Sequence, residues 1–102
     1  MIADQTNNYN IKNVINHGQY IMGPEINQLE KILAEFVGVK HAIVNASGTD
    51  ALLMALLALE VAPGDEVITS PFTFFACAEV IALCQAKPVF VDISNRNFNI
   101  DP

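Results

Sequence analysis

Apolar residues recur at helical spacing in the first half of the chain. Four of them lie three or four positions apart: Ile26, Leu29, Leu33 and Phe36. This spacing predicts an amphipathic helix with one apolar stripe. Pro24 marks its start, because proline suits the first helical position, and Gly38 marks its end. Residues 8–17 are more polar and favour a short surface helix.

Beyond Gly38 the apolar residues form continuous runs that are separated by turn residues. Short runs between turns indicate buried strands, and longer runs of strong helix formers indicate helices. The pattern predicts, in chain order, a strand over 41–45, a helix over 49–60, a turn over 62–66, a strand over 66–69, a loop over 71–74, a helix from Thr73 or Phe74 to about Gln85, a strand over 87–93 and a polar, extended tail from 94.

Strands that alternate with helices of this length predict an α/β fold with a parallel sheet in β-α-β-α-β order. The helix that contains residues 51–59 is apolar on nearly every side, so it needs cover on nearly every side. Parallel sheets also need both faces covered. Three strands and three helices cannot provide this. We therefore expect an N-terminal segment over 1–37 and, over 38–102, the opening part of a larger α/β domain.

Composition and charge narrow the function classes. Apolar residues make up 52% of the 102 residues, the formal net charge is −6, and five strong bases are scattered along the chain. This distribution gives no basic face for nucleic acid. An anionic ligand would have to be held mainly by backbone N–H groups and hydroxyls.

The cysteines and the N-terminus give no sign of an oxidising compartment or a membrane. Cys77 and Cys84 lie two helical turns apart, which is about 10 Å. That exceeds the roughly 7 Å that a disulfide spans, so we expect two reduced core thiols. No Cys/His cluster indicates a metal site. The N-terminus has no signal pattern, and the longest apolar run, 51–59, is far shorter than the roughly 20 residues that span a bilayer. We expect a soluble, cytoplasmic protein.

The elbow at residues 45–50, Asn-Ala-Ser-Gly-Thr-Asp, lies where the predicted strand turns into the apolar helix. The first turn of a helix has unpaired N–H groups and a partial positive charge. Gly48 lacks a Cβ, so an anion can approach the backbone, and Ser47 and Thr49 add hydroxyl groups. Ligands of open α/β sheets bind at this end of the strands. The elbow therefore favours a phosphate cradle that needs no lysine.

A simpler interpretation of the elbow is helix capping. Ser47 is a good N-cap, and Ser47 to Asp50 resembles a capping box with Asp in place of Glu. Spacing alone favours capping, and the G-x-G-x-x-G and G-K-[ST] signatures are absent. At the next predicted loop, Phe72, Phe74 and Phe75 could supply an apolar face for an aromatic cofactor ring. For Phe72 and Phe75 we favour core packing instead.

Several motifs together resemble the N-terminal part of the sugar aminotransferases of the DegT/DnrJ/EryC1/StrS family. They are G-P-E with its helix, S-G-T-D-A-L, P-G-D-E-V-I, P-x-T-F-x-A and K-P-V-F-V-D-I, in this order, from about Gly18 to Pro102. The resemblance implies the aspartate aminotransferase fold and the cofactor pyridoxal 5′-phosphate. Residues 38–102 would then be part of the cofactor-binding domain.

The resemblance also assigns roles to individual residues. It implies that Gly48 and Thr49, with Ser47 less central, hold the cofactor phosphate, and that Phe74 stacks on the pyridine ring. It further implies a homodimer that transfers an amino group, usually from glutamate, to the keto group of a nucleotide-linked sugar. Among family members, those acting on UDP-linked keto-sugars for surface polysaccharides are the most similar.

The resemblance supplies no catalytic residue within this chain. The family's cofactor-binding lysine and its pyridine-pairing aspartate lie further downstream, and none of the four lysines matches the context: Lys12, Lys31, Lys40 and Lys87. Lys87 precedes a strand, at the opposite end of the sheet from the elbow. Two alternatives to an aminotransferase segment stay open: a small phosphate-binding α/β module without chemistry, and a truncated, inactive gene product.

Overall fold

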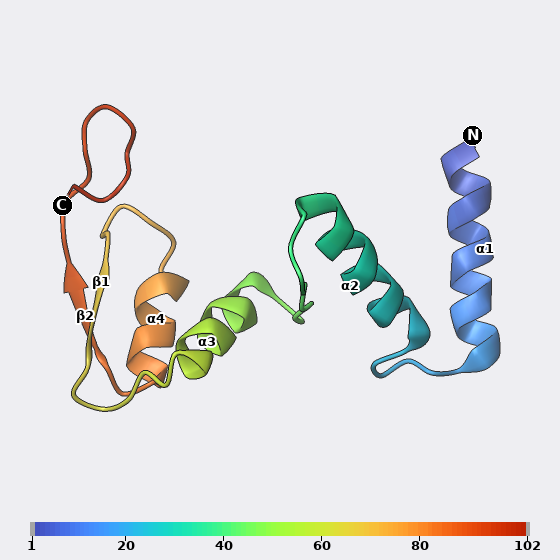
Figure 1. The fold of residues 1–102 in the computed structure, drawn as a ribbon, viewed down its shortest axis with the longest axis horizontal. Coiled ribbons are helices and arrows are strands. Elements are labelled where there is room, and N and C mark those ends of the chain that lie inside the picture. The colour runs from blue at the N-terminus through green and yellow to red at the C-terminus, as the bar shows by residue number, and fades with distance from the viewer. Residues whose placement is uncertain (1, 102) are drawn as a thin grey trace. The chain divides into compact units, whose positions relative to one another are not determined.

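Two units make up the computed structural model, which describes residues 2–101 (Figure 1). The contacts divide the chain between Val44 and Asn45. The first unit contains α1 (Ile2–His17) and α2 (Pro24–Val37). The second contains α3 (Gly48–Ala58), β1 (Glu66–Thr69), α4 (Ala76–Leu83) and β2 (Lys87–Phe90). The predicted division at residue 37 concerns the domains of the whole protein and stays a prediction.

The two helices of the first unit begin and end at residues with clear local reasons. In α2, Pro24 occupies the first turn, and Gly38 ends the helix in the left-handed region with φ 76°. The Gly38 N–H donates to the carbonyl oxygens of Ala34 and Glu35. These bounds confirm the predicted helix. The α1 helix begins at Ile2, six residues before the predicted start at residue 8.

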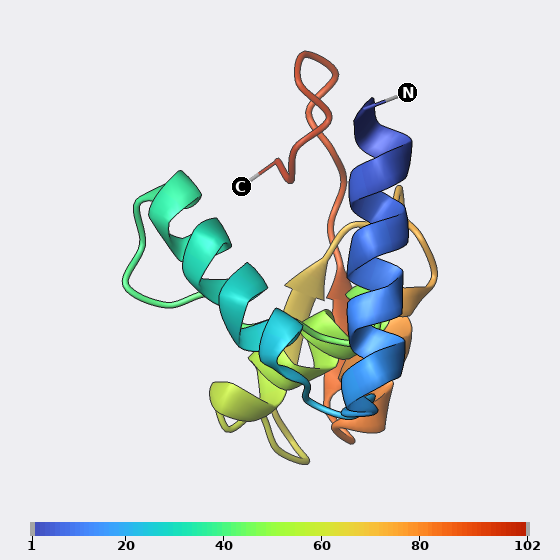
Figure 2. The same ribbon diagram turned by 90° about the vertical axis from the view of Figure 1, so that its right-hand side faces the viewer.

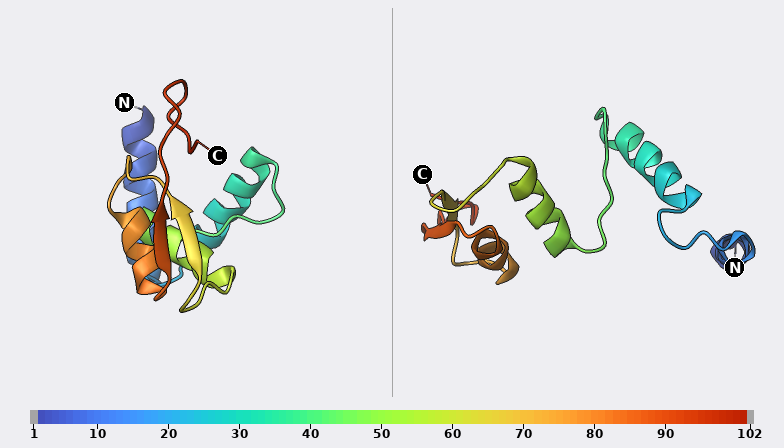
Figure 3. Two further views of the ribbon diagram at one scale, coloured as in Figure 1. Left: turned by 90° about the vertical axis from the view of Figure 1, so that its left-hand side faces the viewer. Right: turned by 90° about the horizontal axis from the view of Figure 1, so that it is seen from below.

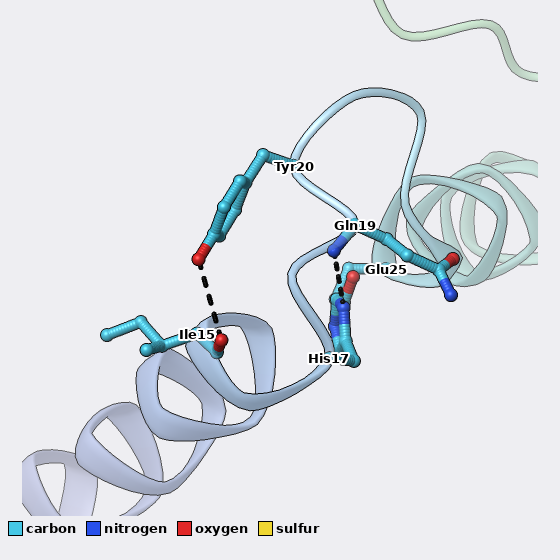
Figure 4. Close-up of polar contacts among 5 residues, drawn as sticks. All are labelled: Ile15, His17, Gln19, Tyr20 and Glu25. Atoms are coloured by element: carbon cyan, nitrogen blue, oxygen red, sulfur yellow. Dashed lines mark hydrogen bonds and ion pairs between the residues drawn. The ribbon is translucent and has the colours of Figure 1, made fainter.

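Polar contacts fix the loop between α1 and α2 (Figure 4). His17 Nε2 lies 2.9 Å from Glu25 Oε1, and His17 Nδ1 accepts the Gln19 N–H at 3.0 Å. The hydrogen bond with His17 lowers the pKa of the Glu25 carboxyl below its ordinary value of 4.5. Gly23 is required here, because a Cβ at this position would lie 2.5 Å from the Gln19 carbonyl oxygen.

The strand predicted over 41–45 is wrong for this chain, because these residues form no strand. The Val44 N–H donates instead to Glu30 Oε1 at 3.1 Å. A strand needs a partner ladder, and the described residues of the first unit contain no strand. The remaining order, α3-β1-α4-β2, keeps the predicted alternation.

The second unit is built on a parallel pair of strands. β1 coincides with the predicted strand over 66–69, and it pairs with β2 in the register Glu66 to Lys87 and Thr69 to Phe90. The Lys87 N–H donates to the Asp65 carbonyl at 2.9 Å, and the Val91 N–H donates to the Thr69 carbonyl at 3.0 Å. The odd-numbered backbone groups of β2 therefore face β1, and the backbone of Pro88 faces away from it.

The chain after β2 turns back on itself, so the prediction of an extended tail is wrong. β2 ends at Phe90, three residues before the predicted end, and the Asp92 side chain accepts the Ile93 N–H at 2.8 Å. Ile93 then forms an antiparallel bridge with Ile100. Asn, Ser and Asp side chains favour such turns by bonding to nearby backbone groups.

The core of the second unit lies at α4, which packs on both strands (Figures 2 and 3). The buried apolar residues among those described are Ala76, Val80, Ile81, Cys84 and Ala86. The α3 helix lies within the predicted 49–60 helix except for its first residue, and it packs against α4 but buries none of its residues. Among residues 2–101, no helix combines the length and apolar character needed to cross a membrane.

Candidate phosphate cradle and cofactor face

The first turn of α3 contains three of the predicted site residues: Ser47, Gly48 and Thr49. Ser47 is the N-cap, in an extended conformation with φ −152° and ψ 166°. Its Oγ accepts the Asp50 N–H at 3.1 Å and donates to Asp50 Oδ2 at 2.9 Å. The N-cap role of Ser47 is therefore confirmed. The predicted capping box differs in one bond, because the Asp50 carboxylate accepts from the Ser47 hydroxyl and not from the Ser47 backbone N–H.

Capping leaves the phosphate interpretation open, because it satisfies only one of the first N–H groups. The Gly48 and Thr49 N–H groups begin the helix and make no hydrogen bond with another described group. A Cβ placed on Gly48 would meet no atom within 4 Å. Packing within this chain therefore does not require glycine here, and the position of a side chain at residue 48 is open. Two N–H donors at the start of a helix, beside this open position, fit a phosphate group.

The charges around the elbow are unusual for an anion site. Asp50 is exposed and lies in the first turn. Its carboxylate interacts favourably with the positive end of the helix dipole, but it would repel a bound anion. The Ser47 hydroxyl proton is donated to this carboxylate, so it is not directed at a ligand. Thr49 is half-buried, and its hydroxyl makes no hydrogen bond with a described residue. Gly48 and Thr49 are therefore better placed than Ser47 to donate to a phosphate.

Phe74 lies in the loop between β1 and α4, where it is 77% exposed. The loop is longer than predicted, because α4 begins at Ala76 and the Phe72 N–H donates to Ser70 Oγ at 3.0 Å. Core packing of Phe72 and Phe75 is wrong for this chain, since they are 69% and 73% exposed. Phe72 instead contacts the ring of Phe98, with centroids 6.0 Å apart.

The structure does not join Phe74 to the elbow. The connection between them runs through α3 and α4, which pack against each other. Each part of the predicted site is therefore formed locally, and their mutual distance depends on this helix packing.

Lys87 lies at the amino end of β2, as the sequence predicts, and it bonds to Glu66 at 2.6 Å. That hydrogen bond raises the pKa of the Lys87 ammonium above its ordinary value of 10.5. A lysine that attacks a carbonyl needs the opposite shift, because only the neutral amine is nucleophilic. Lys87 is therefore a structural ion-pair residue. Both cysteines are free: Cys84 is buried, and Cys77 is only half-buried.

The turn after β2 is a part of this region that the sequence pattern did not reveal. Its contact with Phe72 places it beside the loop that carries Phe74. The run of Ser, Asn and Arg residues at 94–97 could have indicated a turn, since such residues are typical of turns. The contact between Phe72 and Phe98 has no local signal.

Comparison with known proteins identifies relatives for nearly the whole chain. A UDP-2-acetamido-2-deoxy-3-oxo-D-glucuronate aminotransferase of Pseudomonas aeruginosa is 58% identical over 92 residues, which cover 90% of this chain and 26% of the relative. The chain thus spans about a quarter of the length of the curated relatives that it matches.

Solved structures agree with this fold. A DegT/DnrJ/EryC1/StrS aminotransferase from Brucella abortus superposes with a TM-score of 0.87 at 47% identity, over 92% of this chain and 25% of that one. NtdA of Bacillus subtilis, with bound cofactor PMP, superposes with a TM-score of 0.86 at 37% identity, over 90% and 21%. The chain therefore has the N-terminal part of the fold type I aminotransferase architecture. With its family match extending over residues 2–102, it belongs to the DegT/DnrJ/EryC1/StrS aminotransferase family.

Proposed function

We propose that the whole protein that carries this chain transfers an amino group from glutamate to the keto group of a nucleotide-linked sugar. The product would serve polysaccharide or deoxysugar biosynthesis. The observation that carries this proposal is the first turn of α3, where two N–H groups have no partner among the described residues and no atom lies where a Gly48 side chain would be. It occurs in a chain that is 58% identical to an aminotransferase named for a UDP-linked oxo-sugar. The resemblance implies a homodimer, and the sequence pattern leads us to expect it in the cytoplasm.

In this proposal the α3 elbow binds the phosphate of pyridoxal phosphate. The Gly48 and Thr49 N–H groups donate to the phosphate oxygens, and the positive end of α3 stabilises their charge. The absence of a Cβ at Gly48 lets the phosphate reach the backbone. The cap formed by Ser47 and Asp50 holds the turn in the required geometry. When bound, pyridoxal phosphate supplies an electron sink for amino-group transfer.

Phe74 would present its ring to the cofactor. It is 77% exposed on the loop after β1, at the end of the strands where ligands of α/β sheets bind. Its exposed ring is therefore accessible to a ligand from this end of the sheet. A cofactor ring would cover it and be oriented by it.

The uncovered apolar helices disfavour a self-sufficient phosphate-binding module. None of the residues of α2 or α3 is buried, although both helices contain many large apolar side chains. A stable small module would bury such surface. This observation is compatible with an aminotransferase segment and with an inactive fragment, and activity of the whole protein separates the two.

The test is an amino-transfer assay on the purified whole protein loaded with pyridoxal phosphate. We expect glutamate to be converted to 2-oxoglutarate only when a UDP-linked 3-oxo-sugar is supplied. A sugar without the keto group, such as UDP-N-acetylglucosamine, is the matched control. Absence of transfer to any nucleotide-linked keto-sugar, with the cofactor bound, would contradict the proposed function.

A further inference from the structure

Arg96 lies on an ordered turn at the carboxyl end of β2. The Ser94 N–H donates to the Asn99 carbonyl at 2.8 Å, and the Phe98 N–H donates to the Ser94 carbonyl at 2.9 Å. Ser94 Oγ also accepts the Arg96 N–H at 3.3 Å. The Arg96 side chain therefore projects from a hydrogen-bonded turn rather than from a free tail, which lowers the entropy cost of using it for binding.

This turn lies beside the loop that carries Phe74. Because β1 and β2 are parallel, the two segments that follow them leave the sheet at the same end, which Figure 1 shows as the red turn and the gold loop. The rings of Phe72 and Phe98 join the two segments, with centroids 6.0 Å apart. Arg96 is two residues from Phe98, and Phe74 is two residues from Phe72. The arginine therefore lies on the segment that contacts the loop of the proposed cofactor face.

The charges of the second unit single out this arginine. Residues 45–102 include seven acidic residues and two strong bases, Lys87 and Arg96. Lys87 is at the opposite end of the sheet, in an ion pair with Glu66. Arg96 is exposed and makes no ion pair with a described residue. Two carboxylates flank its turn, Asp92 and Asp101, so an anion that binds here needs the arginine to offset their repulsion.

We infer that Arg96 binds the diphosphate of the nucleotide-linked sugar, an inference that rests on the proposed function. In that reaction the keto carbon of the sugar must reach the cofactor beside Phe74. The diphosphate is several bonds away from this carbon. A group on the turn next to the Phe74 loop, and not on that loop itself, therefore suits the diphosphate. The carboxylate of the donor is attached to the reacting carbon and must lie at the cofactor itself. A guanidinium group can donate two parallel N–H bonds to phosphate oxygens.

The test replaces Arg96 in the whole protein loaded with pyridoxal phosphate. We expect Arg96→Gln to raise the KM for the nucleotide sugar about tenfold, as for the loss of a charge-assisted hydrogen bond, and to leave kcat and the KM for glutamate unchanged. Arg96→Lys should raise that KM only about threefold, since it keeps the charge and loses the paired donors. Lys87→Gln is the matched control, because it removes one positive charge from the opposite end of the same sheet.

Calorimetric titration with UDP gives a readout that does not depend on turnover. We expect Arg96→Gln to weaken UDP binding by the same factor as the KM, and Lys87→Gln to leave it unchanged. Wild-type KM and UDP affinity in an active Arg96→Gln variant would overturn the role of Arg96 alone. A rise confined to the KM for glutamate would assign Arg96 to the donor and also overturn it. Failure of the wild-type protein to aminate any nucleotide-linked keto-sugar would instead overturn the proposed function.

Discussion

The α3 and α4 helices are both built almost wholly from apolar residues, yet only α4 contains buried residues. Ala76, Val80 and Ile81 of α4 are 2–3% exposed, while Leu52 and Leu57 of α3 are 43% and 52% exposed. The difference lies in their partners: among the described helices and strands, α4 packs on both strands and on α3, whereas α3 packs on α4. An apolar run of helix-forming residues therefore predicts a helix, but the helix is buried only where other elements cover it.

The largest expected effect concerns the 102-residue chain expressed alone. Its exposed apolar helices and unpaired strand edges are aggregation liabilities. We expect an insoluble or molten chain with no covalently bound cofactor and no aminotransferase activity, and any amide protection confined to α4 and the two strands. Size exclusion and amide exchange measure this. A sharp monomer peak with protected amides in α3 would show that α3 needs no further cover.

A pair of core substitutions sharpens the comparison in the whole protein. Ile81→Ala in α4 should lower the free energy of unfolding by about 2–5 kcal/mol, as for a buried large-to-small change. Leu57→Ala in α3 should cost about the same if the rest of the protein covers α3. Denaturant unfolding of both variants measures this. A cost below about 0.5 kcal/mol for Leu57→Ala would be typical of a surface site and would leave α3 uncovered in the whole protein.

The first turn of α3 should contribute to cofactor binding. In the whole protein we expect Thr49→Val to weaken binding of pyridoxal phosphate by roughly 1–3 kcal/mol, as for a lost hydrogen bond to a charged group. Gly48→Ala should also weaken it without lowering the unfolding temperature, because its Cβ meets no described atom in this chain. Equilibrium dialysis and thermal unfolding measure the two effects.

Ser47→Ala is the matched control for these two variants. It should cost about 0.5–2 kcal/mol of folding stability through loss of the N-cap, and it should lower cofactor affinity less than Thr49→Val does, because the Ser47 hydroxyl is directed at Asp50. If Thr49→Val retains the cofactor on dialysis as the wild type does, Thr49 has no role in phosphate binding.

Two variants in the loop before α4 distinguish the role of Phe74 from that of Phe75. In the whole protein, Phe74→Ala should loosen the cofactor and shift its absorbance, since an aromatic face is lost. Phe75→Ala would cost about 3–5 kcal/mol only where Phe75 is fully buried. In the chain alone it is 73% exposed, so no such cost is expected there. A spectral change caused by Phe75→Ala and not by Phe74→Ala would show that Phe75, and not Phe74, contacts the cofactor ring.

The smallest expected effect concerns the ion pair that joins the amino ends of β1 and β2 below α4. The hydrogen bond to Glu66 raises the pKa of Lys87, so its contribution to stability is complete below the ordinary value of 10.5 and is lost as pH rises through the raised value. Both side chains are largely exposed, so the effect on unfolding is small. Glu66→Gln should return the Lys87 pKa toward its ordinary value in an NMR titration. An unchanged value in that variant would remove Glu66 as the cause.

The sequence was informative wherever the cause of a structure is local. Pro24 and Gly38 delimited α2, the Gly-Asp turn preceded β1 at its observed start, and Ser47 capped α3 as its spacing indicated. Each of these rests on backbone preferences or on hydrogen bonds within a few residues.

What the sequence could not predict depends on partners distant along the chain. Residues 41–45 read as a strand, but a strand requires a ladder that the described chain does not provide. Phe72 and Phe75 read as core residues, but burial requires a covering surface. The same limit applies to the site residues. The local geometry of Gly48 and Thr49 can be predicted from the sequence, but their distance from Phe74 depends on the packing of α3 against α4.

Pro88 has a consequence for how this small sheet can grow. Its backbone faces away from β1, and proline carries no N–H, so the outer side of β2 lacks a donor that another strand would need. The backbone of Glu66 and Ile68 in β1 faces away from β2 and keeps its donors. Pro88 therefore favours β2 as an edge strand, and the free donors of β1 favour addition of further strands on the side of β1.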